Sequence, residues 1–260
     1  MIMLTLKEYQ ARERVCLALD FSCVSEAMNL VFNLSDYTGM FKIGKELHIA
    51  AAETEYPLIE RVYLNSNNLQ GNKERKANIF LDLKLHDTPN TVYKSAIAST
   101  VPGVYIIDVH LAGGEEMCKK ALEGVREAAF KKNIPAPKVV GVTVLTSLSD
   151  KDLEKQGLGI SYEDLVKKRT ELAREWGLDG IVCPANKAGG LEKKFGKWLY
   201  VTTGIRYEND HGSGQEQLYT AEQAVKDCSS SILVIGSAIT KAQNKKERAL
   251  DILKAMAKEL

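Results

Sequence analysis

The sequence predicts a single barrel of eight parallel β-strands that alternate with α-helices, the (β/α)8 fold. Eight short apolar runs, many rich in β-branched residues, recur along the whole chain, and segments with the period of amphipathic helices lie between them. The length agrees, because 260 residues suit one barrel of this kind as well as two smaller domains. We therefore expect residues 1–260 to form one domain.

The expected strands are covered on both faces. Several of the runs are almost continuously hydrophobic rather than alternating, which is the pattern of buried parallel strands. The eight runs occupy residues 15–20, 41–46, 79–84, 105–110, 138–146, 180–185, 199–205 and 232–238.

Helical patterns fill several intervals between the strands. Residues 25–33 begin with Ser25 as a candidate N-cap, residues 115–130 are rich in Ala, Glu and Lys, and residues 162–176 carry one apolar stripe. Thr220 heads a capping box that Gln223 completes. An open, doubly wound sheet is the main alternative. It would require a glycine-rich turn after the first strand, and VCLALDFSCVSEA contains no glycine.

Composition excludes several classes of protein. A formal charge of +1 gives no support to broad binding of nucleic acid or of acidic membranes. The longest apolar stretches are about eight residues, whereas a membrane-spanning helix needs about twenty, and the charged N-terminus does not resemble a signal peptide. The five cysteines are widely spaced without a C-x-x-C pair, so we expect neither a disulfide framework nor a zinc site. We expect a cytoplasmic protein.

The third expected strand carries the strongest chemical signal, LDLKLHDTPNTV. Asp82 and Lys84 are two residues apart and therefore project from the same face of a strand, at the end of the barrel where functional residues lie. Asp87 follows in the loop, and Lys42 comes from the second strand. Such alternating charges would keep Lys84 protonated and positioned as an acid. A surface ion-pair ladder is disfavoured, because inward charge on an apolar strand is costly.

The decamer DLKLHDTPNT, which begins at Asp82, resembles the signature D-x-K-x-x-D-x-P-N-T of the orotidine 5′-phosphate decarboxylase family. Further motifs occur in the family's order over nearly the whole chain, as in the short bacterial form. They are ALD (to Asp20), KIGKE (from Lys42), VHLAGG (from Val109), VTVLTS (from Val142), LDGIVCPA (from Leu178), VTTGIR (to Arg206), Gln215 and VIG (to Gly236).

The resemblance implies decarboxylation of orotidine 5′-monophosphate to uridine 5′-monophosphate without a cofactor or metal, the last step of de novo pyrimidine nucleotide synthesis. Lys84 would donate a proton to C6 of the pyrimidine, and Asp82 would lie beside the substrate carboxylate. Lys42 would hold both Asp82 and a ribose hydroxyl, and Asp20 would bind the ribose.

The resemblance also implies a homodimer as the active unit. Asp87 and Thr91 would reach into the site of the neighbouring subunit, while Thr146 would form a hydrogen bond with the pyrimidine ring.

One position departs from the family pattern. The family has an arginine after VIG that binds the phosphate, and this chain has Ser237. Arg206, Gln215, Gly236 and Ser237 would hold the 5′-phosphate region, with Lys241 as a candidate replacement cation. A charged hydrogen bond to phosphate contributes about 1.5–3 kcal/mol, so we expect substrate binding to be roughly tenfold to a hundredfold weaker unless another cation substitutes.

Two other functions stay open. A magnesium-dependent sugar-phosphate decarboxylase or lyase of the same superfamily shares D-x-K-x-x-D, although the T-P-N-T tail matches the orotidylate enzymes better. A non-catalytic nucleotide-binding barrel would agree with the missing arginine but would not need the set of two lysines and two aspartates. Of the histidines in this region, His86 is expected to be structural, whereas His110 could equally line the pocket.

Overall fold

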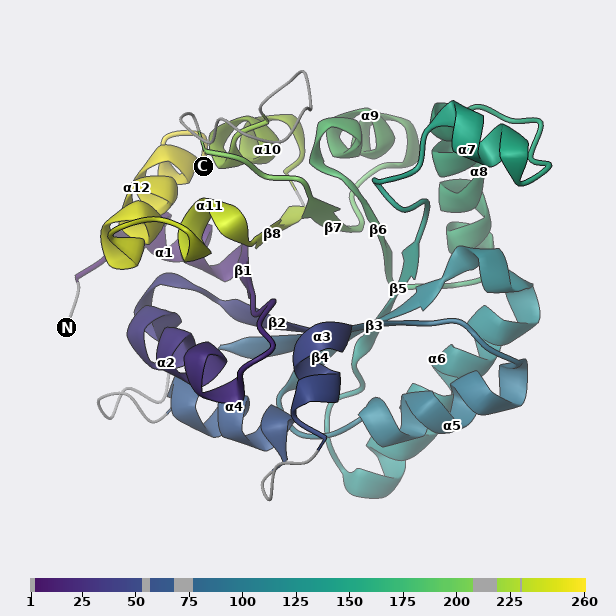
Figure 1. The fold of residues 1–260 in the computed structure, drawn as a ribbon. Helices are drawn as coiled ribbons and strands as arrows, with labels where there is room; N and C mark the ends of the chain where they lie inside the picture. Colours follow the sequence, from purple (N-terminus) through teal and green to yellow (C-terminus); the bar gives the residue numbers. More distant parts are fainter. Residues whose placement is uncertain (1–2, 53–56, 68–76, 208–218, 230) are drawn as a thin grey trace.

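Eight parallel strands close into a barrel in the order of the sequence, as the end-on view in Figure 1 shows. The computed structural model describes residues 3–52, 57–67, 77–207, 219–229 and 231–260. The predicted (β/α)8 fold is confirmed. The strands are β1 (Val15–Ala18), β2 (Met40–Gly44), β3 (Asn78–Leu85), β4 (Val104–His110), β5 (Lys138–Val142), β6 (Gly180–Pro184), β7 (Leu199–Thr203) and β8 (Ser231–Ile235).

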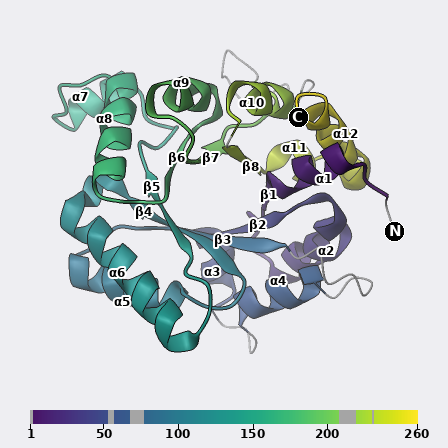
Figure 2. The ribbon, with the colours of Figure 1, turned by 180° about the vertical axis from the view of Figure 1, so that it is seen from behind.

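Helices surround the barrel on all sides, and the view from behind in Figure 2 shows the same ring. Among the residues described, no helix is long and apolar enough to cross a membrane. The α-helices are α1 (Leu6–Glu13), α2 (Val24–Leu34), α3 (Lys45–Ala50), α4 (Leu58–Asn67), α5 (Pro89–Ser99), α6 (Gly114–Lys132), α7 (Asp150–Lys155), α8 (Tyr162–Glu175), α9 (Ala185–Phe195), α10 (Ala221–Asp227), α11 (Ser237–Thr240) and α12 (Lys245–Ala257); the 3-10 helices are η1 (Ser35–Tyr37) and η2 (Leu111–Gly113).

Apolar side chains pack in two layers, one inside the barrel and one between the strands and the helices. Phe80, Ile106 and Val140 belong to the inner layer, whereas Leu81 and Ile107 belong to the outer one. Successive residues of a strand point to opposite faces, so each strand must be apolar on both. This requirement explains the nearly continuous hydrophobic runs of the sequence.

The strands end earlier than several of the predicted runs. β5 ends at Val142 rather than at Thr146, and β8 ends at Ile235, after which Ala238 lies in α11. The last paired residues of β5 and β6 are Val142 and Val182, beyond which the backbone turns and the amide of Leu148 donates to the carbonyl of Leu145. Apolar character continues past the ladder into loops that pack on the barrel, so hydrophobicity alone overextends the strands.

The helix caps agree with the sequence in one place and differ in another. The capping box at Thr220 is confirmed, since the amide of Gln223 donates to Thr220 Oγ1 at 3.2 Å and the amide of Thr220 donates to Gln223 Oε1 at 2.9 Å. Ser25, expected as the N-cap of α2, is instead the second residue of the helix. The cap position is Cys23, whose side chain makes no capping hydrogen bond.

Candidate active site

A cavity of about 920 Å³ opens at the carboxyl ends of the strands. Asp20, Lys42, Asp82 and Lys84 line one side of it, from β1, β2 and β3 and the residues that follow them. The structure therefore brings these four predicted residues together at the end of the barrel where functional residues lie.

The four side chains form a linear array of alternating charge. The ammonium group of Lys42 lies 2.8 Å from Asp20 Oδ1 and 3.1 Å from Asp82 Oδ2. The other oxygen of Asp82, Oδ1, forms an ion pair with Lys84 Nζ. Lys42 and Asp82 are each about 10% exposed, whereas Asp20 and Lys84 reach farther into the cavity. Each inner charge of the array is thus neutralised on both sides.

Proximity of opposite charges keeps the inner pair ionised. Burial alone would raise the pKa of Asp82. Three influences together lower this pKa to about 2: the charge of Lys42, a hydrogen bond with Asp108, and the ion pair with Lys84. Burial would likewise lower the pKa of Lys42, and the carboxylates of Asp82 and Asp20 reverse that effect and raise it. Both groups stay charged at neutral pH.

The backbone of β3 is irregular where it carries the array. Leu81 pairs with Ile107 and Leu85 pairs with Val109, so four steps along β3 match two steps along β4. Lys84 lies within this bulge and adopts a positive φ of 48°, a left-handed conformation that residues other than glycine rarely adopt. The prediction that Asp82 and Lys84 share a face is confirmed by their ion pair, but the strand between them is not regular.

Asp108 belongs to this site and was missed by the sequence analysis. It lies on β4 with no exposed surface, and its Oδ1 accepts a hydrogen bond of 2.7 Å from the amide of Lys84. Its Oδ2 lies 4.0 Å from Lys84 Nζ. A charged residue inside YIIDVH, an otherwise apolar strand, was the available signal.

The cavity also contains predicted phosphate-binding residues, which follow β7 and β8. Arg206 and Ser237 line it and are joined by a hydrogen bond of 3.2 Å from the guanidinium to the hydroxyl. Gly236, Thr146 and Lys241 line the same cavity. Thr146 does so from the loop after β5 rather than from the strand. Gln215 lies outside the described residues.

Asp87 and Thr91 do not join the array of their own chain. Both are exposed, Asp87 accepts a hydrogen bond of 2.6 Å from the amide of Thr88, and Thr91 Oγ1 lies 3.0 Å from Thr88 Oγ1. They lie at the end of β3 and the start of α5.

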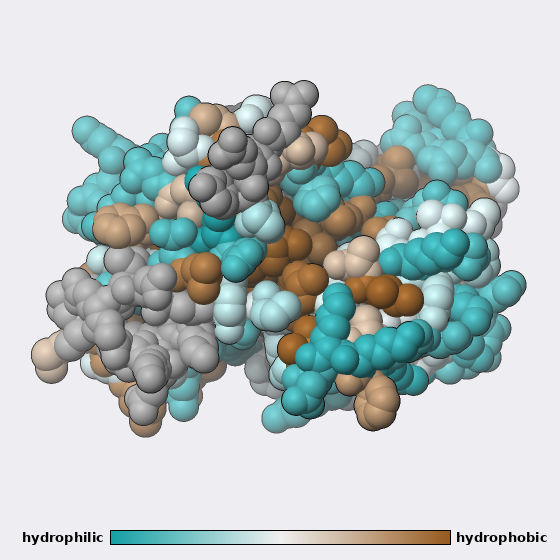
Figure 3. Space-filling model, turned by 90° about the horizontal axis from the view of Figure 1, so that it is seen from below, coloured by the Kyte–Doolittle hydropathy of each residue, from teal (hydrophilic) through white to brown (hydrophobic). Residues whose placement is uncertain are grey.

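Apolar residues, in brown, gather in the middle of the face shown in Figure 3, which lies below α3, α4 and α5 in Figure 1. Ile49 of α3 is 70% exposed.

The two histidines near the site stack on each other outside the cavity. The rings of His86 and His110 lie 5.3 Å apart, and neither side chain is among the residues that line the cavity. Burial, together with His86 and Arg169, lowers the pKa of His110 to about 4. His110 is therefore neutral at pH 7, and the structure favours its packing role over a place in the pocket.

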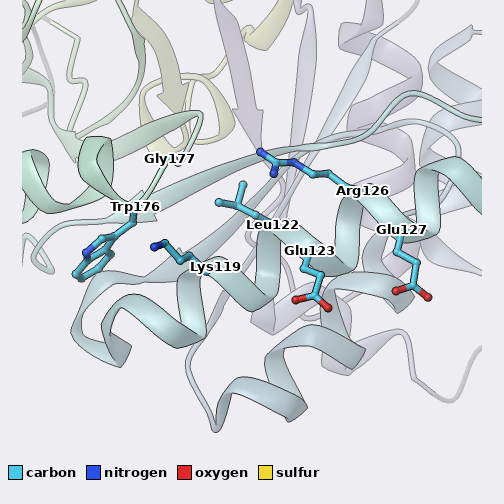
Figure 4. A pocket seen from close by; sticks show the side chains of 7 residues that line it. All are labelled: Lys119, Leu122, Glu123, Arg126, Glu127, Trp176 and Gly177. Atoms are coloured by element: carbon cyan, nitrogen blue, oxygen red, sulfur yellow. The ribbon is translucent and has the colours of Figure 1, made fainter.

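A second, shallower pocket lies on the outer surface of the barrel. Lys119, Leu122, Glu123, Arg126 and Glu127 of α6 line it together with Trp176 and Gly177, as Figure 4 shows. Its carboxylates and cations point outward along a helix surface rather than toward one another. This pocket has no convergent set of polar groups, and the barrel mouth is the better candidate for an active site.

Comparison with known proteins identifies the family. The sequence model of the orotidine 5′-phosphate decarboxylase / HUMPS family matches residues 13–252. The chain belongs to this family. A protein named orotidine 5′-phosphate decarboxylase from Moorella thermoacetica is 36% identical over 89% of this chain and 87% of its own. Another of that name, from Syntrophus aciditrophicus, is 34% identical over 98% of both chains.

Solved structures agree with this membership of the orotidine 5′-phosphate decarboxylase / HUMPS family. The crystal structure of orotidine 5′-phosphate decarboxylase from Lactobacillus acidophilus superposes with a TM-score of 0.76 and 30% sequence identity. The match covers 93% of this chain and 98% of that one. The region matched by the family model contains every site residue that the sequence analysis named.

Proposed function

We propose that this protein decarboxylates orotidine 5′-monophosphate to uridine 5′-monophosphate, and that it does so without a cofactor. The observation that carries the proposal is the array of Asp20, Lys42, Asp82 and Lys84 at the mouth of a barrel of this family. A lysine held by a carboxylate beside an open cavity supplies a fixed cation and a transferable proton at one point.

The chemistry needs both properties of Lys84. When the bond between C6 and the carboxylate breaks, carbon dioxide leaves and the electron pair stays on C6, in an orbital that the ring cannot delocalise. The ammonium group of Lys84 stabilises that charge and then transfers a proton to C6, which forms the C–H bond of the product. The Lys84 side chain is 31% exposed, so solvent can return the proton afterwards.

The other residues orient the substrate. Asp82 lies beside the departing carboxylate, Lys42 and Asp20 hold the ribose, and Thr146 binds the pyrimidine. The 5′-phosphate binds between Arg206, Gly236 and Ser237, together with Gln215. Supporting this placement, the charged array and the pair of Arg206 and Ser237 line the same cavity, so one nucleotide can contact both. Binding energy from the phosphate end then serves the reaction at the base.

The active unit in this proposal is a homodimer in the cytoplasm, each subunit a single domain of residues 1–260. Asp87 and Thr91 are exposed and free of the array of their own chain, which suits residues that complete the site of a second copy. The apolar face in Figure 3 adjoins the elements that carry them. Burial of such a face is a common source of dimer stability.

The other candidate is a magnesium-dependent sugar-phosphate decarboxylase or lyase, whose motif D-x-K-x-x-D this chain shares from Asp82 to Asp87. The geometry supports the decarboxylase. Both oxygens of Asp82 already form ion pairs with lysines, so a metal ion at Asp82 would have to compete with two ammonium groups. An assay of orotidine 5′-monophosphate decarboxylation in the presence of EDTA separates the candidates. The loss of substrate absorbance measures the reaction. Activity that disappears in EDTA would contradict the proposal. A wild-type protein that binds uridine 5′-monophosphate but shows no decarboxylase activity would also contradict it.

Substitution of Lys84 tests the assigned role. Lys84→Ala removes the cation and the proton donor, so we expect kcat to fall by at least about a thousandfold. Lys119→Ala is the matched control, since Lys119 is an exposed lysine of α6 that pairs only with Glu115 among the described residues, and its activity should equal that of the wild type. Equal activity of both variants would exclude Lys84 as the acid.

A further inference from the structure

The bulge in β3 places the backbone of Lys84 in the left-handed conformation, which a lysine does not favour. A left-handed backbone costs a residue with a Cβ about 1 kcal/mol or more. Lys84 is not glycine, and its neighbours Leu83 and Leu85 are anchored by packing against the outer core. Something in the surrounding structure must therefore stabilise this conformation, and the amide of Lys84 shows what does.

The partner of that amide is a side chain rather than the backbone of a neighbouring strand. Asp108 Oδ1 accepts the hydrogen bond at 2.7 Å, and Asp108 has no exposed surface. On β4, Ile106 belongs to the layer inside the barrel and Ile107 and Val109 to the layer outside it, so Asp108 points inward. The carboxyl group of Asp108 therefore lies inside the barrel beside the bulge, where it accepts the hydrogen bond from the Lys84 amide.

We propose that Asp108 is a positioning residue, which fixes the bulged backbone of Lys84 and thereby directs its ammonium group at the reacting carbon. The proposal rests on the decarboxylase function proposed above. Asp108 is absent from the lining of the cavity that the described residues form, so it acts through Lys84 and not on the substrate.

The charge balance of the site indicates the form in which Asp108 does this. Asp20, Asp82 and Asp108 would give three negative charges against the two of Lys42 and Lys84. Among the described residues, no donor forms a hydrogen bond with Oδ2 of Asp108. Burial, and then the charge of Asp82, raise the pKa of Asp108. A retained proton on Asp108 leaves two charges of each sign.

Three variants test the proposal, with kcat, KM, uridine 5′-monophosphate affinity and melting temperature as readouts. Asp108→Asn keeps a neutral group whose oxygen can accept from the Lys84 amide. Asp108→Val removes the acceptor but suits the apolar barrel interior, and Asp108→Ala replaces it if the valine variant does not fold. Thr202→Val is the control, since it removes a buried hydroxyl that bonds the Ile232 carbonyl on the far side of the barrel.

Asp108→Asn should keep kcat within about threefold of the wild type. Asp108→Val should lose about a hundredfold in kcat, the effect expected when a catalytic group is displaced by about an ångström, while its affinity for uridine 5′-monophosphate changes little. Thr202→Val should change neither. Equal kcat in the asparagine and valine variants would overturn the proposal. So would parallel losses of kcat, nucleotide affinity and melting temperature, which indicate a structural role only.

Crystal structures of the two Asp108 variants separate this inference from the proposed function. If wild-type protein does not decarboxylate the substrate, the proposed function fails, whatever Asp108 does. The φ angle of Lys84 still reports positioning: it should stay positive in Asp108→Asn and leave the left-handed region in Asp108→Val. An unchanged Lys84 backbone in the valine variant would overturn the inference by itself.

Discussion

Asp82 gives the charged array its rigidity, because its two carboxylate oxygens form ion pairs with different lysines. A buried ion of this kind is costly unless both of its oxygens are satisfied. Lys42 pairs with Oδ2 of Asp82 and Lys84 pairs with Oδ1. Neither lysine can move away without leaving one oxygen of this buried carboxylate unpaired. The position of Lys84, the proposed proton donor, is thus fixed before any ligand enters.

Ser237 accepts a hydrogen bond from Arg206 in the part of the cavity where we propose that the phosphate binds. We predict that Ser237→Arg lowers KM for orotidine 5′-monophosphate by roughly tenfold to a hundredfold, since it adds a charged hydrogen bond to phosphate. Steady-state kinetics measure this effect. Gln10→Arg, which adds the same charge on exposed α1, should leave KM unchanged. An unchanged KM in Ser237→Arg would show that residue 237 does not contact the phosphate.

His110 makes the stability of the protein depend on pH. Its pKa is about 4 in the folded state, through burial and then the charges of His86 and Arg169, and near 6.5 in an unfolded chain. The unfolded state therefore binds more protons between these values, and stability is full above pH 6.5 and falls as the pH drops toward 4. Half-burial limits the loss to about 1–2 kcal/mol.

Urea unfolding at pH 7.5 and pH 5 measures the contribution of His110. The difference in unfolding free energy between the two pH values should shrink in His110→Asn. The exposed His48 of α3 provides the control, and His48→Asn should keep the wild-type difference. A His110→Asn variant that keeps the full difference would assign the pH dependence to other groups.

At the scale of elements, the strands were predictable and their irregularities were not. A strand buried on both faces must be apolar, so eight such runs revealed eight strands. The alternation of side chains also placed Asp82 and Lys84 on one face. Periodicity assumes a regular backbone, however, and the bulge at Lys84 depends on Asp108, about twenty-four positions later in the chain. The bond between Arg206 and Ser237 joins separate elements in the same way.

The packing of α5 on α6 depends on a glycine. A Cβ on Gly124 of α6 would lie 2.6 Å from the Tyr93 carbonyl oxygen of α5 and 3.1 Å from Ala96 Cβ. We predict that Gly124→Ala lowers the free energy of unfolding by about 1–3 kcal/mol, because the two helices must separate. Gly190→Ala in α9 meets nothing within 4 Å and should instead gain about 0.5–1 kcal/mol. Thermal unfolding compares the two, and a stabilised Gly124→Ala would disprove the close contact.

At the scale of the whole molecule, the proposed dimer predicts recovery of activity between two inactive variants. Lys84→Ala and Asp87→Ala subunits each damage every site of their own homodimers. A hybrid dimer contains one site that has Lys84 from one subunit and Asp87 from the other. After mixing and reassociation, decarboxylase activity should rise to about a quarter of the wild-type value, because half of the dimers are hybrids with one intact site. Sites completed within one subunit would show no recovery.

The barrel closes where β8 pairs with β1, so the cavity joins the first and last strands of the chain. A Cβ on Gly236 would lie 3.9 Å from Asp20 Oδ2, although 216 positions separate the two residues. If a nucleotide binds to both residues, as proposed, it would hold the first and last strands together, and its binding free energy would add to the free energy of unfolding. Substrate supply would then regulate how long the enzyme survives proteolysis, as well as how fast it turns over.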